Sequence, residues 1–245
     1  MRENIRHSFE QLLDKIICNE EEIVRYIENP ETTDSDFLLT YFNQHAFNIF
    51  WDNEEYRNWL LTDFHVFYDG IGLFSVLSLY KRARKRLVAT DTYNKIFNRI
   101  INNAKYKIAL IGGKEELHAI ISNHSEIKNI VFHKEGNFTD NFIKEIETEL
   151  LLYGPNILMI AMGTPLQEEV ALHVSKIYHN CLIICVGNFL EFYFGSIKRA
   201  PVIFQKLGIE WLFRLITEPR RLWKRYILGI PEFLYRIIKI KFGLK

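Results

Sequence analysis

Short apolar runs alternate with amphipathic stretches through the middle of the chain, and most of the junctions carry glycine. The apolar runs fall at 105–113, 128–136, 155–163 and 181–188, and the amphipathic stretches between them at 114–124, 141–154 and 164–179. A strand that is followed by a covering helix returns to the sheet in the same direction, so this order predicts a parallel sheet with helices on both faces. In such an α/β fold, ligands bind beyond the carboxyl ends of the strands.

The N-terminal part carries weaker versions of the same signals. Apolar residues recur at helical spacing over residues 1–30, which predicts one or two amphipathic helices. Strands are expected at 36–42 and 64–70, with a helix over 44–61 after the first and a helix over 76–86 after the second. We therefore expect residues 1–195 to form one α/β domain that carries residues 1–30 as a helical extension.

The C-terminal segment holds nearly all of the excess positive charge. Residues 196–245, called the tail below, contain twelve Lys or Arg and three Asp or Glu, a net charge of +9. The whole 245-residue chain carries only +1, so residues 1–195 carry −8. Basic residues alternate with Trp, Phe, Tyr, Leu and Ile along the tail, a pattern that suits an anionic membrane interface or packing on protein. The tail is predicted to be a basic, helical, membrane-binding appendage.

The composition of the chain limits which cell compartment and which kinds of binding partner are expected. No apolar run approaches the roughly 20 residues that a membrane-spanning helix needs, and the opening residues, MRENIRHSFEQLLDKI, lack the apolar stretch of a secretory leader. These features predict a cytoplasmic protein that is peripheral on the inner face of the cell membrane. The acidic balance of residues 1–195 disfavours nucleic acid as a partner. Cys18, Cys181 and Cys185 have no further ligand at metal-binding spacing, so neither a metal nor a cofactor is expected.

Polar residues or glycines follow four of the expected strands and should converge at one edge of the sheet. They are Thr40 with Asn43, then Asp69, then Gly112 with Gly113, and finally Thr164 with Gln167 and Glu168. Glycine lets the backbone approach a ligand, and the following helix N-termini offer N–H groups to phosphate. The sequence IGGK around the glycine pair is neither a GxxxxGK[ST] loop nor a GxGxxG fingerprint, so it supports neither ATP hydrolysis nor NAD binding. A glycine pair is also typical of a tight turn between strand and helix.

Two acidic residues at these ends each have two interpretations. Asp69 precedes glycine, which is typical of a turn former, but at a strand end it can also act as a general base toward an acceptor hydroxyl. Glu168 lies in the first turn of an expected helix, where a carboxylate gains from the helix dipole and can cap. Its neighbour Gln167 has no such ready explanation.

Charges on the tail fall on one helical stripe. Arg214, Glu218, Arg221 and Arg225 are spaced by four, three and four residues. The stripe can be a solvated basic face, or it can be a clamp for a diphosphate, since arginine offers forked and permanently charged donors. Pro219 is expected at a break between two helices. An apolar face beside the stripe, if exposed, also suggests a homo-oligomer.

These motifs together resemble a known family. The run GNFLEFYFGSIKRAPVIFQKLGIEWLFRLITEPRRLWKRYILGIPEFL is similar to the C-terminal signature of the WecG/TagA/CpsF glycosyltransferases, and TYFNQH, YDGIG, RLVATD, ALIGG and MGTPLQE follow the family's order. The resemblance extends over residues 37–233. It implies a Rossmann-like catalytic domain over residues 1–195 and a metal-independent, inverting enzyme. The implied reaction moves a sugar from a UDP-sugar to a polyprenyl-diphosphate-linked acceptor sugar at the inner membrane face, for a bacterial cell-surface polysaccharide.

The resemblance also assigns roles to single residues. It implies that Asp69 is the general base and that Arg221 and Arg225 act on the diphosphate. The residues that it implies for substrate binding are Thr40, Asn43, Arg86, Asp91, Gln167, Arg199 and Arg214. We add Gly112, Gly113 and Thr164, which stand where the donor phosphates are expected.

The chain departs from the family pattern at a few positions. Ala89 replaces a usual glycine, Leu166 stands where a basic residue is common, and Glu191 replaces aspartate. These departures bear on which donor and acceptor are used, and the helical first thirty residues are not the family's usual beginning. Two other classes of function remain. One is a non-catalytic membrane-surface scaffold that keeps the fold, and the other is a nucleotide-binding oxidoreductase, which the missing glycine fingerprint disfavours.

Overall fold

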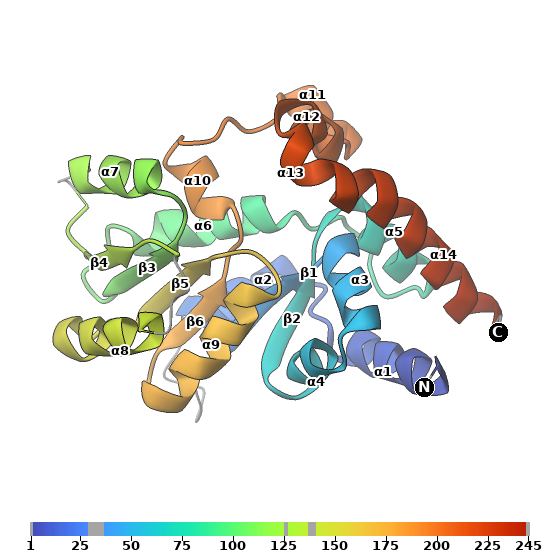
Figure 1. The fold of residues 1–245 in the computed structure, drawn as a ribbon, viewed down its shortest axis with the longest axis horizontal. Coiled ribbons are helices and arrows are strands. Elements are labelled where there is room, and N and C mark those ends of the chain that lie inside the picture. The colour runs from blue at the N-terminus through green and yellow to red at the C-terminus, as the bar shows by residue number, and fades with distance from the viewer. Residues whose placement is uncertain (1, 29–36, 125–126, 137–140, 244–245) are drawn as a thin grey trace.

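The computed structural model describes residues 2–28, 37–124, 127–136 and 141–243, which form a six-stranded parallel sheet covered by helices (Figure 1). The strands are β1 (Leu38–Phe42), β2 (Phe64–Tyr68), β3 (Ile108–Gly112), β4 (Ile130–Lys134), β5 (Ile157–Ala161) and β6 (Leu182–Cys185). They lie in the order β2-β1-β6-β5-β3-β4, and every neighbouring pair is parallel. The α/β parallel sheet that the sequence predicts is confirmed.

Helices cover both faces of the sheet, as predicted. One face carries α3 (Gln44–Asp52), α4 (Glu54–Thr62), α8 (Phe142–Tyr153) and α9 (Leu166–Ile177). The other carries α6 (Ala89–Ile100), α7 (Glu115–Asn123) and α10 (Phe189–Tyr193), and α5 (Gly70–Leu79) leads from β2 toward α6. Right-handed crossovers explain which helices lie on which face. A connection that moves along the sheet toward β2 must cross one face, and a connection that moves toward β4 must cross the other.

The N-terminal helices close the β2 edge of the sheet. They are α1 (Arg2–Lys15) and α2 (Glu20–Glu28), and Phe9 and Leu12 of α1 are fully buried, as is Ile23 of α2. Between them the backbone N–H of Ile17 donates to the carbonyl of Val66 at 2.8 Å. A covered edge strand has no free ladder for another chain to pair with. The helical extension expected over residues 1–30 is therefore part of the fold.

Two of the expected helices are wrong in their bounds. The helix expected over 44–61 is divided at Asn53, whose N–H ends α3 on the Ile49 carbonyl and whose Oδ1 accepts the Tyr56 N–H at 3.0 Å to begin α4. The helix expected over 76–86 ends at Leu79, because Lys81 adopts a positive φ of 57°. The chain then turns and forms α6, a helix that the sequence pattern did not predict.

The tail is almost entirely helical. It forms α11 (Val202–Leu207), α12 (Glu210–Thr217), α13 (Pro219–Trp223), a π-helical turn (Lys224–Leu228) and α14 (Gly229–Phe242). Pro219 occupies the first position of α13, where its missing N–H has no helical partner to lose, so the predicted break is confirmed. Within the described residues no helix is both long and apolar enough to cross a bilayer.

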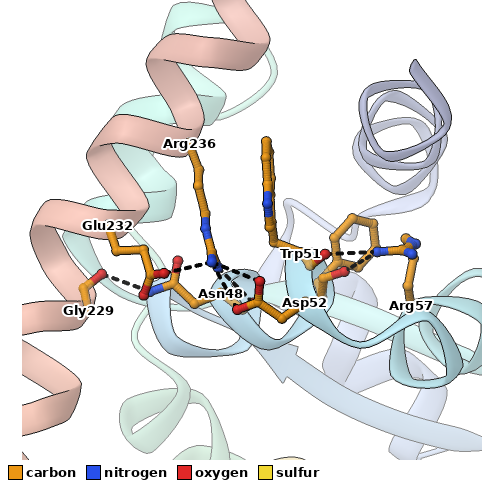
Figure 2. A network of polar contacts seen from close by, with 8 residues as sticks. Asn48, Trp51, Asp52, Arg57, Gly229, Glu232 and Arg236 are labelled. Atoms are coloured by element: carbon orange, nitrogen blue, oxygen red, sulfur yellow. Dashed lines mark hydrogen bonds and ion pairs between the residues drawn. The ribbon is translucent and has the colours of Figure 1, made fainter. Parts of the chain in front are cut away.

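The tail is held to the body by a contact between α14 and α3, shown in Figure 2 and called the α14–α3 contact below. The Asn48 amide donates to the Gly229 carbonyl at 2.8 Å. The Arg236 guanidinium donates to the Asn48 carbonyl at 2.9 Å and to both carboxylate oxygens of Asp52 at 2.8 and 2.9 Å. It also reaches Glu232 at 2.6 Å, so one buried cation satisfies a backbone carbonyl and two carboxylates.

Apolar packing accompanies these polar bonds. Phe233 is 2% exposed and meets Phe47 of α3 edge to face, with ring centroids 5.1 Å apart. Arg236 lies 5.4 Å from the centroid of the Trp51 ring. Such ring contacts add about 0.5–1.5 kcal/mol each beyond the buried area. The contact is therefore a packed interface as well as an ion pair.

We expect Arg236→Ala to lower the free energy of unfolding by about 2–4 kcal/mol, because the Asn48 carbonyl and both carboxylates lose their shared partner. Urea unfolding followed by circular dichroism measures this change. Arg6→Ala serves as the matched control, since within the described residues Arg6 pairs with Glu10 alone and 54% of its side chain is exposed. The control should cost about 0.5 kcal/mol or less. Equal losses in the two variants would show that the α14–α3 contact contributes no more than a surface pair.

Candidate active site

The carboxyl ends of three neighbouring strands place polar side chains around one cavity. Asn43 follows β1, Asp69 follows β2 and Asn188 follows β6, and all three line the cavity. The tail supplies the opposite wall through residues that include Arg214 and Arg225. The cavity has a volume of about 150 Å³ and is called the first cavity below. Segments far apart in the sequence thus meet where a parallel sheet is expected to bind its ligand.

Asp69 is fixed in orientation but is not used as a helix cap. It stands at the position before α5 with extended backbone, and its side chain accepts no N–H from that helix. Its Oδ1 accepts the Ala89 N–H at 2.9 Å, and the Asn43 amide donates to its Oδ2 at 3.4 Å. Asn43 is itself held, because its Oδ1 accepts the N–H groups of His45 and Ala46 at 3.0 and 3.1 Å. The carboxylate is therefore directed into the cavity by two neighbouring elements.

The environment of Asp69 favours proton acceptance. Burial raises the pKa of its carboxyl above the ordinary value, while the Ala89 N–H, the Asn43 amide, Arg225 and Arg214 lower it. Burial is the largest of these effects, so the net direction is upward. A general base gains strength as its pKa rises toward the working pH. The carboxylate is still partly exposed to the cavity, so it can reach a bound molecule.

Two arginines of the tail, Arg214 and Arg225, line the same cavity as Asp69. Arg214 donates to the Asn188 Oδ1 at 3.3 Å, and its guanidinium lies 5.5 Å from the centroid of the Phe192 ring. Among the described residues, the buried Nε atoms of Arg214 and Arg225 find no hydrogen-bond partner. Because those Nε atoms have almost no exposed surface, an anion in the first cavity would contact the other parts of the two side chains, which line it.

A second, larger cavity adjoins the first. It has a volume of about 630 Å³ and is lined by Thr164, His45 of α3, and Arg221, Lys224 and Arg225 of the tail. Burial, followed by the charge of Arg225, lowers the pKa of His45 to about 4, so this imidazole is neutral at physiological pH. Arg221 is half exposed, and its Nε donates to Glu218 at 2.7 Å. Of the two tail arginines predicted to act on a diphosphate, only Arg225 lines both cavities.

A fully buried network lies beside the cavities. The Glu168 Oε1 accepts from Thr40 at 2.6 Å, from the Gln167 amide at 2.9 Å and from Thr164 at 3.2 Å. Gln167 also accepts the Gly187 N–H at 3.0 Å, which fixes the loop after β6. Thr40 and Gln167 are completely buried and line neither cavity, whereas Thr164 lines the second. The structure thus brings Thr40, Gln167 and Thr164 together, as predicted residues of one site. They surround the Glu168 carboxyl group and do not jointly line a cavity.

Glu168 is therefore more than a first-turn carboxylate. It bonds its own backbone N–H, as a residue there can, and it also accepts from three side chains. Burial is the largest influence on its pKa and raises it, against the lowering effect of those donors. Among the described residues its buried Oε2 has no partner. A carboxyl group that is buried with one unpaired oxygen favours the protonated form.

The other arginines that the sequence predicted, Arg86 and Arg199, already have hydrogen-bond or ion-pair partners. Arg86 lines the first cavity and donates to the Gln205 carbonyl at 2.6 Å. Arg199 and Asp91 are brought together at 2.7 Å, and Arg199 also pairs with Glu210 at 3.3 Å. These two carboxylates hold the Arg199 guanidinium, so the cluster ties α6 to α12. Of this cluster, Glu210 reaches the first cavity.

The glycine pair lies elsewhere. Neither Gly112 nor Gly113 lines the two cavities, and both have positive φ, at 107° and 78°. A Cβ at Gly112 would stand 2.4 Å from the Ala161 carbonyl oxygen, and a Cβ at Gly113 would meet Leu117 at the same distance. Close packing and backbone conformation therefore account for both glycines.

Several cavity residues were absent from the sequence prediction, among them Asn188, Glu210 and Tyr41. Asn188 follows a strand as Asn43 does, and its amide also bonds Glu191, so its place after CLIICVG was a usable signal. Glu210 and Tyr41 gave no such signal, since one lies within the tail and the other within a strand. Among the described residues, no group of three or more His, Cys, Asp or Glu side chains is arranged to hold a metal ion.

Comparison with known proteins adds two findings. The model of the family described as "Glycosyl transferase WecG/TagA/CpsF family" matches residues 12–245. A relative from Bacillus subtilis (strain 168) is 26% identical over 193 residues, covering 76% of this chain and 73% of the relative. That relative is named N-acetylglucosaminyldiphosphoundecaprenol N-acetyl-beta-D-mannosaminyltransferase. The family match includes the strand ends, the first cavity and the tail.

We expect Glu168→Gln to reduce the dependence of stability on pH. Because the folded state raises the pKa of Glu168 above its ordinary value of 4.5, folding favours the protonated form. Its contribution is therefore complete below pH 4.5 and is lost as pH rises through the raised value. Urea unfolding of the wild type at pH 5 and pH 8 should show a larger loss than that of the variant. Asp69 shifts in the same direction, so part of the dependence should remain. An unchanged pH dependence would contradict a raised pKa at Glu168.

Proposed function

Because this chain belongs to the WecG/TagA/CpsF family of glycosyltransferases, we propose that it is a metal-independent, inverting enzyme that uses a UDP-sugar. The proposed acceptor is a sugar linked to polyprenyl diphosphate, and the product belongs to a bacterial cell-surface polysaccharide. The transferred sugar is of the N-acetylmannosamine, N-acetylmannosaminuronic acid or hexose type. The name of the Bacillus subtilis relative, with its diphosphoundecaprenol acceptor, supports the lipid-linked acceptor and the first of these sugars.

The observation that carries the proposal is the position of Asp69 opposite arginines on one cavity. Its carboxylate has a raised pKa and faces the space that Arg214 and Arg225 also line. In the proposed step the acceptor hydroxyl attacks the anomeric carbon from the face opposite the leaving group, and Asp69 accepts the hydroxyl proton. The bond from that carbon to the phosphate oxygen breaks, and the electron pair leaves with UDP. Inversion at the anomeric carbon follows from this single displacement.

The tail supplies charge for the leaving group. Arg214 and Arg225 line the first cavity, where negative charge would grow on the diphosphate in the proposed step. Fixed donors in a site that excludes water stabilise such charge without reorganisation. In this proposal the guanidinium groups perform the task that a bound cation performs in other transferases. Arg221 and Lys224 line the second cavity and would meet the diphosphate of the lipid acceptor.

We also propose that the tail rests on the inner membrane face. Eleven of the seventeen exposed large apolar residues in the described part of the chain belong to it: Val202, Ile203, Leu207, Ile216, Trp223, Ile227, Leu228, Leu234, Tyr235, Ile238 and Phe242. The exposed Lys224 and Lys241 and the half-buried Lys239 lie among them. Apolar side chains beside cations suit the interface of an anionic bilayer.

The direct test is release of UDP from a panel of UDP-sugars, with a short-chain prenyl-diphosphate-linked sugar as acceptor and EDTA in the buffer. We expect release that depends on the acceptor and persists in EDTA. Asp69→Asn should lower kcat by about 1,000-fold or more, because the amide cannot accept the proton. The Kd for UDP, measured by calorimetry, should change less than about threefold, which corresponds to about 0.7 kcal/mol.

Each result has a defined meaning. Absence of turnover together with absence of UDP binding would favour the scaffold that retains the fold. A loss of UDP affinity in Asp69→Asn that equals its loss of turnover would contradict the base assignment. The activity of the wild type at acidic pH should fall as Asp69 becomes protonated, since only the carboxylate can act as the base. A rate that does not fall on acidification would contradict the same assignment.

Membrane contact has its own test. We expect the protein to sediment with phosphatidylglycerol vesicles and not with phosphatidylcholine vesicles at low salt. The double variant Lys239→Glu/Lys241→Glu should bind at least about tenfold more weakly, since each basic residue near an anionic surface contributes about 1 kcal/mol. The control Lys144→Glu/Lys176→Glu makes the same charge change on α8 and α9 and should bind as the wild type does. Equal binding by all three proteins would contradict a membrane role for the tail.

A further inference from the structure

Tyr41 stands on the wall that the two cavities share. Among the described residues, only Tyr41, Asn188 and Arg225 line both cavities. The side-chain oxygen of Asn188 accepts from Arg214, and its amide donates to Glu191, so both ends of that side chain are engaged. Arg225 is the cation of the shared wall. Tyr41 is therefore its remaining polar group, and it is neutral.

The residues around Tyr41 leave room for its hydroxyl group and hold its ring. Gly187 has a φ of 56°, and a Cβ added there would stand 2.3 Å from the hydroxyl oxygen. The loop that contains Gly187 is fixed by its hydrogen bond to Gln167 at 3.0 Å. The Tyr41 ring meets Tyr93 edge to face, with centroids 6.4 Å apart, and the Tyr93 hydroxyl is bonded to the Cys185 carbonyl at 2.8 Å. Both the ring and the space for its hydroxyl are thus fixed in place.

The charge state of the hydroxyl suits a donor. Burial is the largest influence on the Tyr41 phenol and, against the lowering effect of Arg225, raises its pKa to about 12. Glu168 and Asp69 raise it further, and a side-chain hydrogen bond with Thr164 lowers it. The group therefore keeps its proton across the physiological range and can donate a hydrogen bond but cannot act as a base. It lies within the electrostatic influence of both Arg225 and Asp69, the two groups between which the transfer is proposed to occur.

We propose that the Tyr41 hydroxyl donates a hydrogen bond to a phosphate oxygen of the leaving nucleoside diphosphate. The inference rests on the proposed glycosyl transfer and adds a catalytic residue to it. The bond between the anomeric carbon and the phosphate oxygen breaks, and its electron pair passes to that phosphate. The acceptor proton goes to Asp69, and Tyr41 keeps its own proton throughout. A neutral donor beside Arg225 adds directionality that a charge alone does not supply.

The test compares two substitutions that remove the same atom. Tyr41→Phe deletes the hydroxyl and keeps the ring. Tyr56→Phe is the matched control, because Tyr56 is fully buried, lines neither cavity, and has a hydroxyl beside Thr164, as Tyr41 does. We expect Tyr41→Phe to lower kcat by about 100-fold, as loss of one donor to a developing anion does. The KM for the UDP-sugar should stay within about threefold. Tyr56→Phe should leave kcat within about threefold of the wild type.

Thermal unfolding of both variants completes the design. Melting temperatures within a few degrees of the wild type would show that the loss of kcat is not a loss of fold. A kcat for Tyr41→Phe within threefold of the wild type would overturn the inference, and so would equal losses in both variants. A rise in KM at constant kcat would overturn it as well, since it would place the bond in the ground state. Absence of acceptor-dependent turnover in the wild type would instead reject the proposed function.

Discussion

The site depends on the α14–α3 contact, because in the described part of the chain no other pairing of a tail helix with the body is as extensive. Helices α11, α12 and α13 contain six, eight and five residues, and α11 and α12 bury no residue fully. Helices of that length are not stable on their own in water. Their positions follow from α14, which buries Phe233, Arg236 and Ile240, and from Leu222 and Tyr226 ahead of it. The place of Arg214 and Arg225 opposite Asp69 is therefore a consequence of tertiary packing.

Charge complementarity explains why the tail and the body fold together and why Asp69 remains usable. Residues 1–195 carry −8 and the tail carries +9, so their association is favoured over the whole surface. At Asp69 burial and the arginines act in opposite directions on the pKa, and burial prevails. The same arginines retain unpaired Nε donors. Within the described residues no hydrogen bond or ion pair joins Asp69 to either arginine, so its carboxylate can take a proton. Arg214 instead donates to Asn188 at 3.3 Å and lies 3.9 Å from the Glu218 carboxylate.

The sequence predicted the parallel sheet, the helical character of the N-terminal segment, the break at Pro219 and the convergence of Asn43 and Asp69. These features depend on local periodicity, on glycine and proline, and on the rule that parallel strands end at one edge. The division of α3 from α4 depends on one capping side chain, Asn53, within a continuous helical pattern. The roles of Thr40 and Gln167 depend on contacts with Glu168 across 128 residues and with Gly187 across 20 residues, which no local pattern records. Tyr41 was missed for a similar reason, since its importance follows from two cavities that exist only in the folded chain.

The tail has two faces with different chemistry, and its rigidity couples them. Its inner side presents Arg225 and Arg214 to the cavities, and its outer side exposes large apolar residues such as Ile227, Leu228 and Leu234 to solvent. Lys224–Leu228 runs directly into α14, so cations and exposed apolar groups belong to one continuous helical segment. Removing the outer side from water is favourable by about 25 cal/mol for each Å² of apolar surface. If the tail can contact a bilayer only when it is docked on the body, bilayer contact would also stabilise the docked position of the arginines near Asp69. A lipid-linked substrate would arrive at the same place.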